Sequence, residues 1–365
     1  LRATQIQAHP ALVGFDGFID SILHMVDVRR DMSPSGYERF TSIGAFAARC
    51  AAAAGKSTNI EQVLIEDRFG GNGPLMAGAL ARLGMPVTYI GAVGDGAVHP
   101  VFAPFADRMS EVIAVGPPSR TDCLEFDDGK LMFNNTANVQ AVTWERLLER
   151  VGMPRLLKLV NEASLLGIVN WSLAGGVPGI WRALANEVWP RVREAPRRLF
   201  VDLSDPAKRT DADIIGALTQ LRELEQLNGL SVTLGLNLAE SERIAAVLGV
   251  NEGAPARPDQ LAARARAIRA MAGLDCVVIH PREGAAAANA AGEQDWFDGP
   301  FTPTPRLSTG AGDHFNAGFA FAQVHGLTLA ECLAVACGLS GAYVRDAESP
   351  VRERVGGLLA GQPRP

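Results

Sequence analysis

Continuous apolar runs alternate with amphipathic stretches along most of the chain. Apolar runs of about four to eight residues that end in glycine or polar residues predict buried strands, and apolar positions three and four apart predict helices. The predicted strands cover 87–93, 165–170, 199–203, 231–236 and 276–280, and the predicted helices cover 44–54, 75–83, 240–248, 261–271 and 332–344. Because this alternation is typical of parallel sheets, we expect an α/β fold: a doubly wound, mostly parallel sheet with helices on both faces.

One segment interrupts the alternation. Residues 121–126 and 130–134 have strand-like patterns around Asp127-Asp128-Gly129, which is typical of a β-hairpin. A hairpin inserted into a doubly wound domain suits a lid or a dimer contact, and an edge hairpin without a role is the open alternative. We expect one domain over 1–365, with a small β lid formed by segments around 14–20 and 111–138.

The composition limits what this domain can do. With 47% hydrophobic and 20% charged residues, a chain of 365 residues can bury a large core, and its net charge of −6 argues against a nucleic-acid surface. No apolar run in the sequence reaches membrane-spanning length. The five cysteines show no Cys-x-x-Cys spacing, so neither a zinc site nor a disulfide framework is indicated. We therefore expect a cytoplasmic protein that binds neither nucleic acid nor a membrane.

Polar residues and glycines lie where ligands bind in open α/β sheets, at the carboxyl ends of strands. Asp16 and Asp20 follow the first apolar run and are candidates to bind polyol hydroxyls, although turn-forming Asp residues are the alternative. Gly71 and Asn72 precede the helix predicted over 75–83. The glycine permits close approach of the backbone to a ligand, and the amide can both donate and accept hydrogen bonds.

Asn237 and Glu240 lie three residues apart at a predicted junction between a strand and a helix. Both side chains can therefore face the same side of the turn. Amide and carboxylate oxygens suit a hydrated Mg²⁺ ion, which keeps most of its waters. The alternative is an acidic residue favoured in the first turn of a helix by the helix dipole.

The stretch 308–318 combines a glycine turn with an acid. Gly310, Ala311 and Gly312 can present backbone N–H groups at the start of a helix, which is a site for a phosphate-like anion. Asp313 follows directly, and a carboxylate beside an anion site can accept the proton of an incoming hydroxyl. Phosphoryl transfer needs both parts. An N-cap Asp after a glycine turn is the alternative.

Three separated stretches together resemble the ribokinase-like (PfkB) carbohydrate kinases. They are Gly70-Gly71 before a helix, Asn237-Leu238-Ala239-Glu240 after a strand, and Thr309-Gly310-Ala311-Gly312-Asp313 with Asn316 near the C-terminus. Their order and spacing resemble that family over essentially the whole chain, including the position of the hairpin. The resemblance implies ATP-dependent phosphorylation of a primary hydroxyl of a sugar or sugar-like alcohol, with Mg²⁺, and it suggests a homodimer formed through the lid.

The resemblance also implies a role for each matching residue. Asp313 would be the general base, and Gly310, Ala311 and Gly312 would form the anion hole for the transferred group. Asn237 and Glu240 would hold Mg²⁺ and its waters. The remaining assignments are sugar binding by Asp16, Asp20, Gly71 and Asn72, nucleotide binding by Gly284 and Asn316, and a contact of the helix over 332–344 with adenine.

Two departures from the family pattern bear on specificity. Leu307 replaces the acid that commonly opens the glycine signature, which argues against a monovalent-cation site. Leu75 replaces an Asn common in the sugar-contacting motif, so one hydroxyl contact would have to come from elsewhere, for example Asn134 or Asn135. The segment from His24 to Asp67 is also longer than the family pattern suggests, and together these departures argue against ribose as the substrate.

Two other functions remain open on this scaffold, a nucleoside kinase and a catalytically silent regulator that binds sugar or nucleotide. The scarcity of aromatic residues near Asp16 disfavours a nucleoside. The intact Asp313 and the intact Asn237 and Glu240 pair argue against a silent protein. A dehydrogenase is disfavoured because no Gly-x-Gly-x-x-Gly motif follows the first predicted strand.

Overall fold

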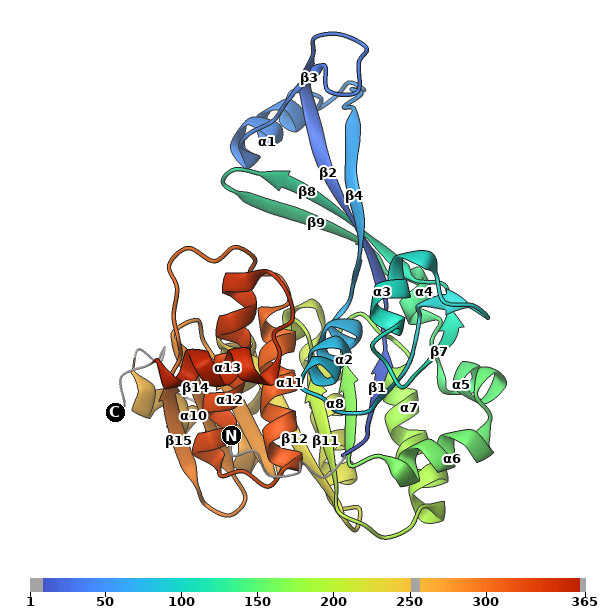
Figure 1. Ribbon diagram of the computed structural model, residues 1–365, viewed down its shortest axis with the longest axis vertical. Coiled ribbons are helices and arrows are strands. Elements are labelled where there is room, and N and C mark those ends of the chain that lie inside the picture. Colours follow the sequence, from blue (N-terminus) through green and yellow to red (C-terminus); the bar gives the residue numbers. More distant parts are fainter. Residues whose placement is uncertain (1–8, 251–256, 362–365) are drawn as a thin grey trace.

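The computed structural model describes residues 9–250 and 257–361, and one large sheet carries most of this part of the chain (Figure 1). In spatial order its strands are β15 (Gln294–Asp298), β14 (Gly284–Asn289), β13 (Cys276–His280), β12 (Leu230–Asn237), β11 (Arg197–Asp202), β10 (Leu165–Val169), β1 (Ala11–Phe15), β5 (Val87–Gly91), β7 (Glu111–Gly116) and β6 (Gly94–Asp95). Neighbours from β13 to β7 pair in parallel, and antiparallel pairs occur at the two edges. The sheet is the mostly parallel one that the apolar runs predict.

Helices cover both faces of this sheet because alternate strand residues face two separate cores. In β13, Val277 and Ile279 belong to one core, whereas Cys276 and Val278 belong to the other. One face is covered by α5 (Trp144–Arg150), α6 (Met153–Glu162), α7 (Val177–Ala183), α8 (Asp211–Glu225), α9 (Leu238–Leu248) and α10 (Pro258–Ala272). The other is covered by α2 (Asn72–Arg82), α11 (Ala311–Val324), α12 (Leu329–Asp346) and α13 (Arg352–Ala360).

The regular elements lie close to where the apolar pattern predicts them. The five predicted strands correspond to β5, β10, β11, β12 and β13. The helices predicted over 75–83, 240–248, 261–271 and 332–344 correspond to α2, α9, α10 and α12. Among the described helices, none combines the length and the apolar character that a bilayer crossing requires.

A second, smaller sheet projects from the large one (Figure 1). Its strands are β2 (Phe18–Arg29), β3 (Tyr37–Arg39), β4 (Gln62–Gly70), β8 (Ser119–Phe126) and β9 (Gly129–Asn135). β8 and β9 form the hairpin expected over 121–134, with Phe126 paired to Gly129 at its turn. The two segments expected to form a lid need new boundaries, because Gly14 and Phe15 belong to β1, and 111–116 is β7 of the large sheet.

Residues 24–66 extend this small sheet. They form the end of β2, all of β3, helix α1 (Ile43–Ala51) and most of β4. Met25, Phe40, Leu124 and Phe126 form a separate small core, against which Phe46 of α1 packs. The small sheet therefore has its own apolar support at the end distant from the large sheet.

The chain passes between the two sheets near the carboxyl end of β1. β1 leads through residues 16–17 into β2, and β4 returns through Gly71 into α2. A Cβ at Gly17 would lie 2.1 Å from the Ala92 carbonyl oxygen, so only glycine fits at this crossing. The crossing brings Asp16 and Asn72 to the junction of the sheets.

Candidate active site

Asp16 is fully buried at this junction and caps the N-terminus of α2. Its carboxylate accepts hydrogen bonds from the N–H groups of Asn72 (3.0 Å) and Gly73 (2.8 Å) and from Nδ2 of Asn170 (2.6 Å). Burial raises the pKa of Asp16 to about 6, and these three donors act in the opposite direction. At Gly71 φ is +106°, and a Cβ there would lie 3.0 Å from the Asp16 carboxylate, which explains the glycine.

Asp313 lies in the first turn of α11, and Asn72 links it to Asp16. The side-chain Nδ2 of Asn72 donates to Oδ1 of Asp313 at 2.9 Å, while the backbone N–H of Asn72 donates to Asp16. Burial raises the pKa of Asp313 well above its usual range, and the charges of Asp202, Asp16 and Glu240 raise it further. A carboxylate in such surroundings is a stronger base than an exposed one.

Asn237 and Glu240 lie at the start of α9, where Glu240 is in the first turn of the helix. Asn237 Oδ1 accepts from the Glu240 N–H at 3.0 Å, and Glu240 Oε2 accepts from the Asn237 N–H at 2.8 Å, which forms a capping box at the start of α9. The other oxygen, Oε1, accepts from the Asp205 N–H at 2.9 Å. Burial, followed by the charge of Asp202, raises the pKa of Glu240 to about 7.

Asn316 is placed differently from its expected nucleotide contact. It is fully buried, and its Nδ2 donates to Oδ2 of Asp202 at 2.6 Å. Burial raises the pKa of Asp202 despite this bond and the bond from the Ser204 N–H. Asn316 therefore holds the carboxylate of Asp202 rather than facing an open cavity.

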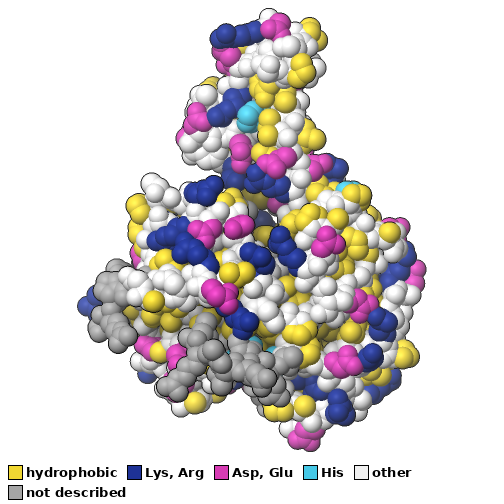
Figure 2. All heavy atoms as spheres, viewed as in Figure 1, with side chains coloured by type: hydrophobic (Ala, Val, Ile, Leu, Met, Phe, Trp, Pro, Cys, Tyr) yellow, Lys and Arg dark blue, Asp and Glu magenta, His cyan; other side chains and the backbone are white. Residues whose placement is uncertain are grey.

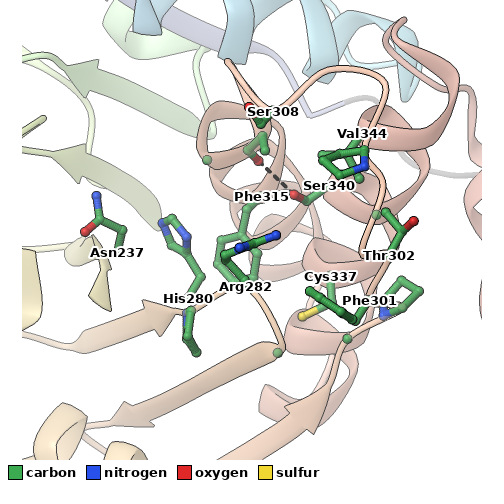
Figure 3. A pocket seen from close by; sticks show the side chains of 18 residues that line it. Asn237, His280, Arg282, Phe301, Thr302, Ser308, Phe315, Cys337, Ser340 and Val344 are labelled. Carbon is green, nitrogen blue, oxygen red and sulfur yellow. Dashed lines mark hydrogen bonds between the residues drawn. The ribbon is translucent and has the colours of Figure 1, made fainter. Parts of the chain in front are cut away.

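A cavity of about 590 Å³ lies beside α11 and α12 (Figure 3). Figure 3 shows Asn237 and His280 toward one end of it and Phe301, Thr302 and Val344 toward the other. The predicted residues Asn237, Gly284, Ala311 and Gly312 all line it, as does Gly341 of the helix expected to flank adenine. This volume lies within the range of roughly 300–1,000 Å³ that small-molecule sites occupy.

A smaller cavity of about 80 Å³ lies between the small sheet and the glycine signature. Its lining includes Asp20, Arg68 and Lys130 from the small sheet and Thr309 and Tyr343 from the large domain. Burial raises the pKa of Asp20, which accepts a hydrogen bond from Thr121. The two departures from the family pattern, Leu75 and Leu307, also line this cavity.

The glycine signature forms a wall shared by the two cavities. Thr309 lines the smaller cavity, whereas Ala311 and Gly312 line the larger one. Gly310 has φ of +88° and precedes the first residue of α11, so the loop reverses direction there. The N–H of Ala311 donates to the Ser308 carbonyl at 3.2 Å, which differs from the expected set of three inward N–H groups.

Other residues of the site are expected from the sequence only as polar strand ends that converge on one crevice, without an assigned role. Asn170 directly follows β10 and Asp202 ends β11, and both are buried. His280 also ends a strand, and its buried Nε2 has no hydrogen-bond partner among the described residues. Arg68 and Lys130 gave no signal, because they reach the smaller cavity only through the pairing of β2 with β4 and of β8 with β9.

Comparisons with known proteins show which sequences and structures this chain is similar to. A family model described as prokaryotic ketohexokinase matches residues 3–362. A ketohexokinase from Haloferax volcanii is 32% identical over 354 residues, which are 96% of this chain and 90% of that protein.

Solved structures show a similar fold at lower sequence identity. Ribokinase from Arabidopsis thaliana, complexed with ribose and ATP, has a TM-score of 0.66 and 17% identity, over 98% of this chain and 100% of that one. A phosphofructokinase-2 mutant from Escherichia coli has a TM-score of 0.67 and 15% identity, over 97% of this chain and 98% of that one. The large sheet with its small projecting sheet is therefore a ribokinase-like fold.

Proposed function

The chain belongs to the prokaryotic ketohexokinase family of ribokinase-like, ATP-dependent sugar kinases, and on this premise we propose that it phosphorylates a primary hydroxyl of a ketohexose. One observation carries the assignment of the site. The signature loop separates a cavity of nucleotide size from a smaller cavity under the small sheet, and the buried acid Asp313 follows this loop directly. A phosphoryl group that passes from one cavity to the other must pass this loop.

Asp313 acts as the general base in this proposal. Its carboxylate accepts the proton of the sugar hydroxyl while that oxygen forms a bond to the γ-phosphorus and the bond from phosphorus to the bridging oxygen of ADP breaks. The raised pKa of Asp313 makes the carboxylate a better proton acceptor, and the bond from Asn72 orients it. Because the nucleophile and the base are held together, much of the entropy loss that the transfer requires has already occurred when the sugar and ATP bind.

The N–H groups of the signature loop stabilise the transferring group. Gly310 and Gly312 are the donors this proposal assigns to the equatorial oxygens, because the Ala311 N–H is engaged by the Ser308 carbonyl. Removing one such donor in other enzymes lowers the rate by about 10²- to 10³-fold.

The sugar occupies the smaller cavity. Asp20, Arg68 and Lys130 offer charged groups to sugar hydroxyls there, and Asn72 beside Gly71 offers an amide. Asp16 holds the start of α2 in place rather than binding the sugar directly, because three N–H donors already bind its carboxylate. At about 80 Å³ the cavity is smaller than the roughly 300 Å³ at which ligand sites begin, so sugar entry requires the small sheet to move.

The residues around Glu240 fit a hydrated divalent cation. Glu240 and Asp202 are two buried carboxylates. Burial and then the charge of Asp202 raise the pKa of Glu240, and a cation nearby would relieve the repulsion between the two groups. Both Glu240 oxygens accept backbone N–H groups, which suits contact through water rather than direct ligation. Glu240, Asp202 and Asn237 would hold Mg²⁺, which supplies charge neutralisation at the phosphates when bound. A potassium requirement is not expected, because Leu307 replaces the acid that opens the signature.

The test is ADP release by the purified protein with ATP and Mg²⁺ against ketohexoses, aldohexoses, pentoses and nucleosides. We expect turnover with a ketohexose, and a loss of about 10²- to 10⁴-fold in kcat for Asp313→Asn, the usual contribution of a general base. Asp107→Asn, at an exposed turn, is the matched control. Turnover of nucleosides alone would favour a nucleoside kinase, and ligand binding without turnover would favour a silent regulator.

A further inference from the structure

Three consecutive carbonyl groups of the signature loop each accept a hydrogen bond from a different side chain. Tyr343 Oη donates to the Thr309 carbonyl at 2.8 Å, His314 Nδ1 contacts the Gly310 carbonyl at 2.7 Å, and Ser340 Oγ donates to the Ala311 carbonyl at 2.9 Å. Tyr343 and Ser340 lie on α12, one turn apart, and His314 directly follows Asp313 on α11. The loop is thus fastened along its whole length to the helices behind it.

These bonds determine where the loop's N–H groups point. A peptide unit is planar and trans, so the N–H of residue i+1 points away from the carbonyl of residue i. With the Thr309 and Ala311 carbonyls directed at α12, the Gly310 and Gly312 N–H groups point away from α12. The peptide group between Gly310 and Ala311 is fixed at both ends, since the Gly310 carbonyl contacts His314 and the Ala311 N–H donates to the Ser308 carbonyl.

His314 is itself held firmly. A carbonyl oxygen only accepts, so Nδ1 carries the proton, and Nε2 accepts from Ser349 Oγ at 2.8 Å. Its ring stacks on the Tyr343 ring, with centroids 3.6 Å apart and planes 15° apart. Burial lowers the pKa of His314 to about 4, so the ring stays neutral and keeps this arrangement near neutral pH.

We propose that Tyr343, His314 and Ser340 are positioning residues that orient the loop's N–H groups toward the transferring phosphoryl group. This inference rests on the proposed function, because it takes the loop as the anion hole. Tyr343 lines the smaller cavity and Ser340 the larger one, but the effect proposed for the three side chains is exerted through the loop. Their effect is to remove the reorganisation that free peptide groups would undergo when charge develops on the phosphoryl oxygens.

The experiment compares Tyr343→Phe, Ser340→Ala and their double variant with the wild type. Each change removes one hydroxyl and leaves the packing nearly unchanged. We expect kcat to fall about 10-fold for each single variant and about 100-fold for the double variant, part of the loss that removal of a donor causes, with KM for sugar and ATP within about threefold of wild type. Tyr37→Phe, which removes a tyrosine hydroxyl bonded to His24 in the small sheet, is the matched control.

A second measurement needs no sugar substrate. ADP alone and ADP with aluminium fluoride, which mimics the planar phosphoryl group, are titrated in the presence of Mg²⁺. We expect the variants to bind ADP as the wild type does but to lose about 10-fold in the additional affinity that aluminium fluoride provides. Unchanged kcat in folded variants, or equal losses for ADP with and without aluminium fluoride, would overturn the proposal. A wild type without turnover would instead refute the proposed function, and the aluminium fluoride comparison would still decide whether Tyr343 and Ser340 position the loop.

Discussion

At the scale of single residues, the site contains four buried carboxyl groups. Burial raises the pKa of Asp16, Asp202, Glu240 and Asp313, and their charges raise the pKa of Asp313 and Glu240 further. A folded-state pKa above the unfolded value means that the folded protein binds more protons, so its stability falls as pH rises through this interval. The proposed mechanism needs Asp313 in its ionised form, whereas the fold is more stable when Asp313 is neutral.

Asp313→Asn should therefore stabilise the protein while it removes activity. Asn keeps an oxygen for the Asn72 bond but cannot ionise, so the repulsion by Asp202, Asp16 and Glu240 is lost. Without Mg²⁺ or nucleotide, we expect Tm at pH 8 to rise by roughly 1–2 °C, the change that about 1 kcal/mol produces in a chain of 365 residues. The gain should shrink as pH falls, because the raised pKa of wild-type Asp313 favours its protonated form and the repulsion is then lost in the wild type as well. Thermal unfolding from pH 5 to 8 checks this, with Asp107→Asn as control; a gain independent of pH would contradict it.

At the scale of elements, the site depends on the close packing of α11 against α12. Gly318 of α11 faces the Ala336 backbone, and a Cβ at Gly318 would lie 2.8 Å from Ala336 Cα. The two helices carry Asp313 and the side chains that fasten the signature loop. Their separation would therefore disturb both the fold and the site.

The same substitution at two helical glycines should have opposite effects. Gly318→Ala forces α11 and α12 apart and should lower the free energy of unfolding by roughly 1–3 kcal/mol, with reduced kcat. Gly216→Ala, in α8, meets open space and should raise the free energy of unfolding by about 0.5–1 kcal/mol, because alanine loses less backbone entropy. Urea unfolding of both variants provides the measurement. Equal effects at the two positions would show that the helix contact does not limit stability.

The sequence predicts the elements of the large sheet well because its strands are continuous apolar runs. The motifs at element ends also single out Asp313 and Asn72, which a hydrogen bond joins, and Asn237 and Glu240, which form a capping box. The roles of these four residues in a reaction stay predictions. It does not predict that 24–66 extends the small sheet, because the small core of Met25, Phe40, Leu124 and Phe126 joins segments far apart in sequence. The sequence also does not predict that Arg68 and Lys130 line the smaller cavity. Their positions depend on the pairing of strands that are far apart in sequence.

At the scale of the whole molecule, the small sheet leaves apolar side chains exposed. Figure 2 shows apolar side chains along one side of the projecting part. Large exposed ones lie on β4 and β9, namely Leu64 (54% exposed), Ile65, Met132 and Phe133 (56% exposed). β4 and β9 are on opposite edges of the small sheet, and exposed apolar edge strands are surfaces that proteins normally cover.

A second copy of this chain is the partner we predict for these edges, in keeping with the homodimer expected through the lid. Light scattering after gel filtration should give the mass of two chains, each 38.7 kDa, at micromolar concentration. The double variant Leu64→Ser, Phe133→Ser should shift the mass toward one chain, because removing the apolar contact area weakens association. Met271→Ser, equally exposed at 52% but on α10, is the control and should leave the mass unchanged. The prediction is wrong if the wild type has the mass of one chain at every concentration, or if the double variant keeps the mass of two chains. In either case the small sheet does not form a dimer contact, and a second chain would not restrict the movement proposed for it over the smaller cavity.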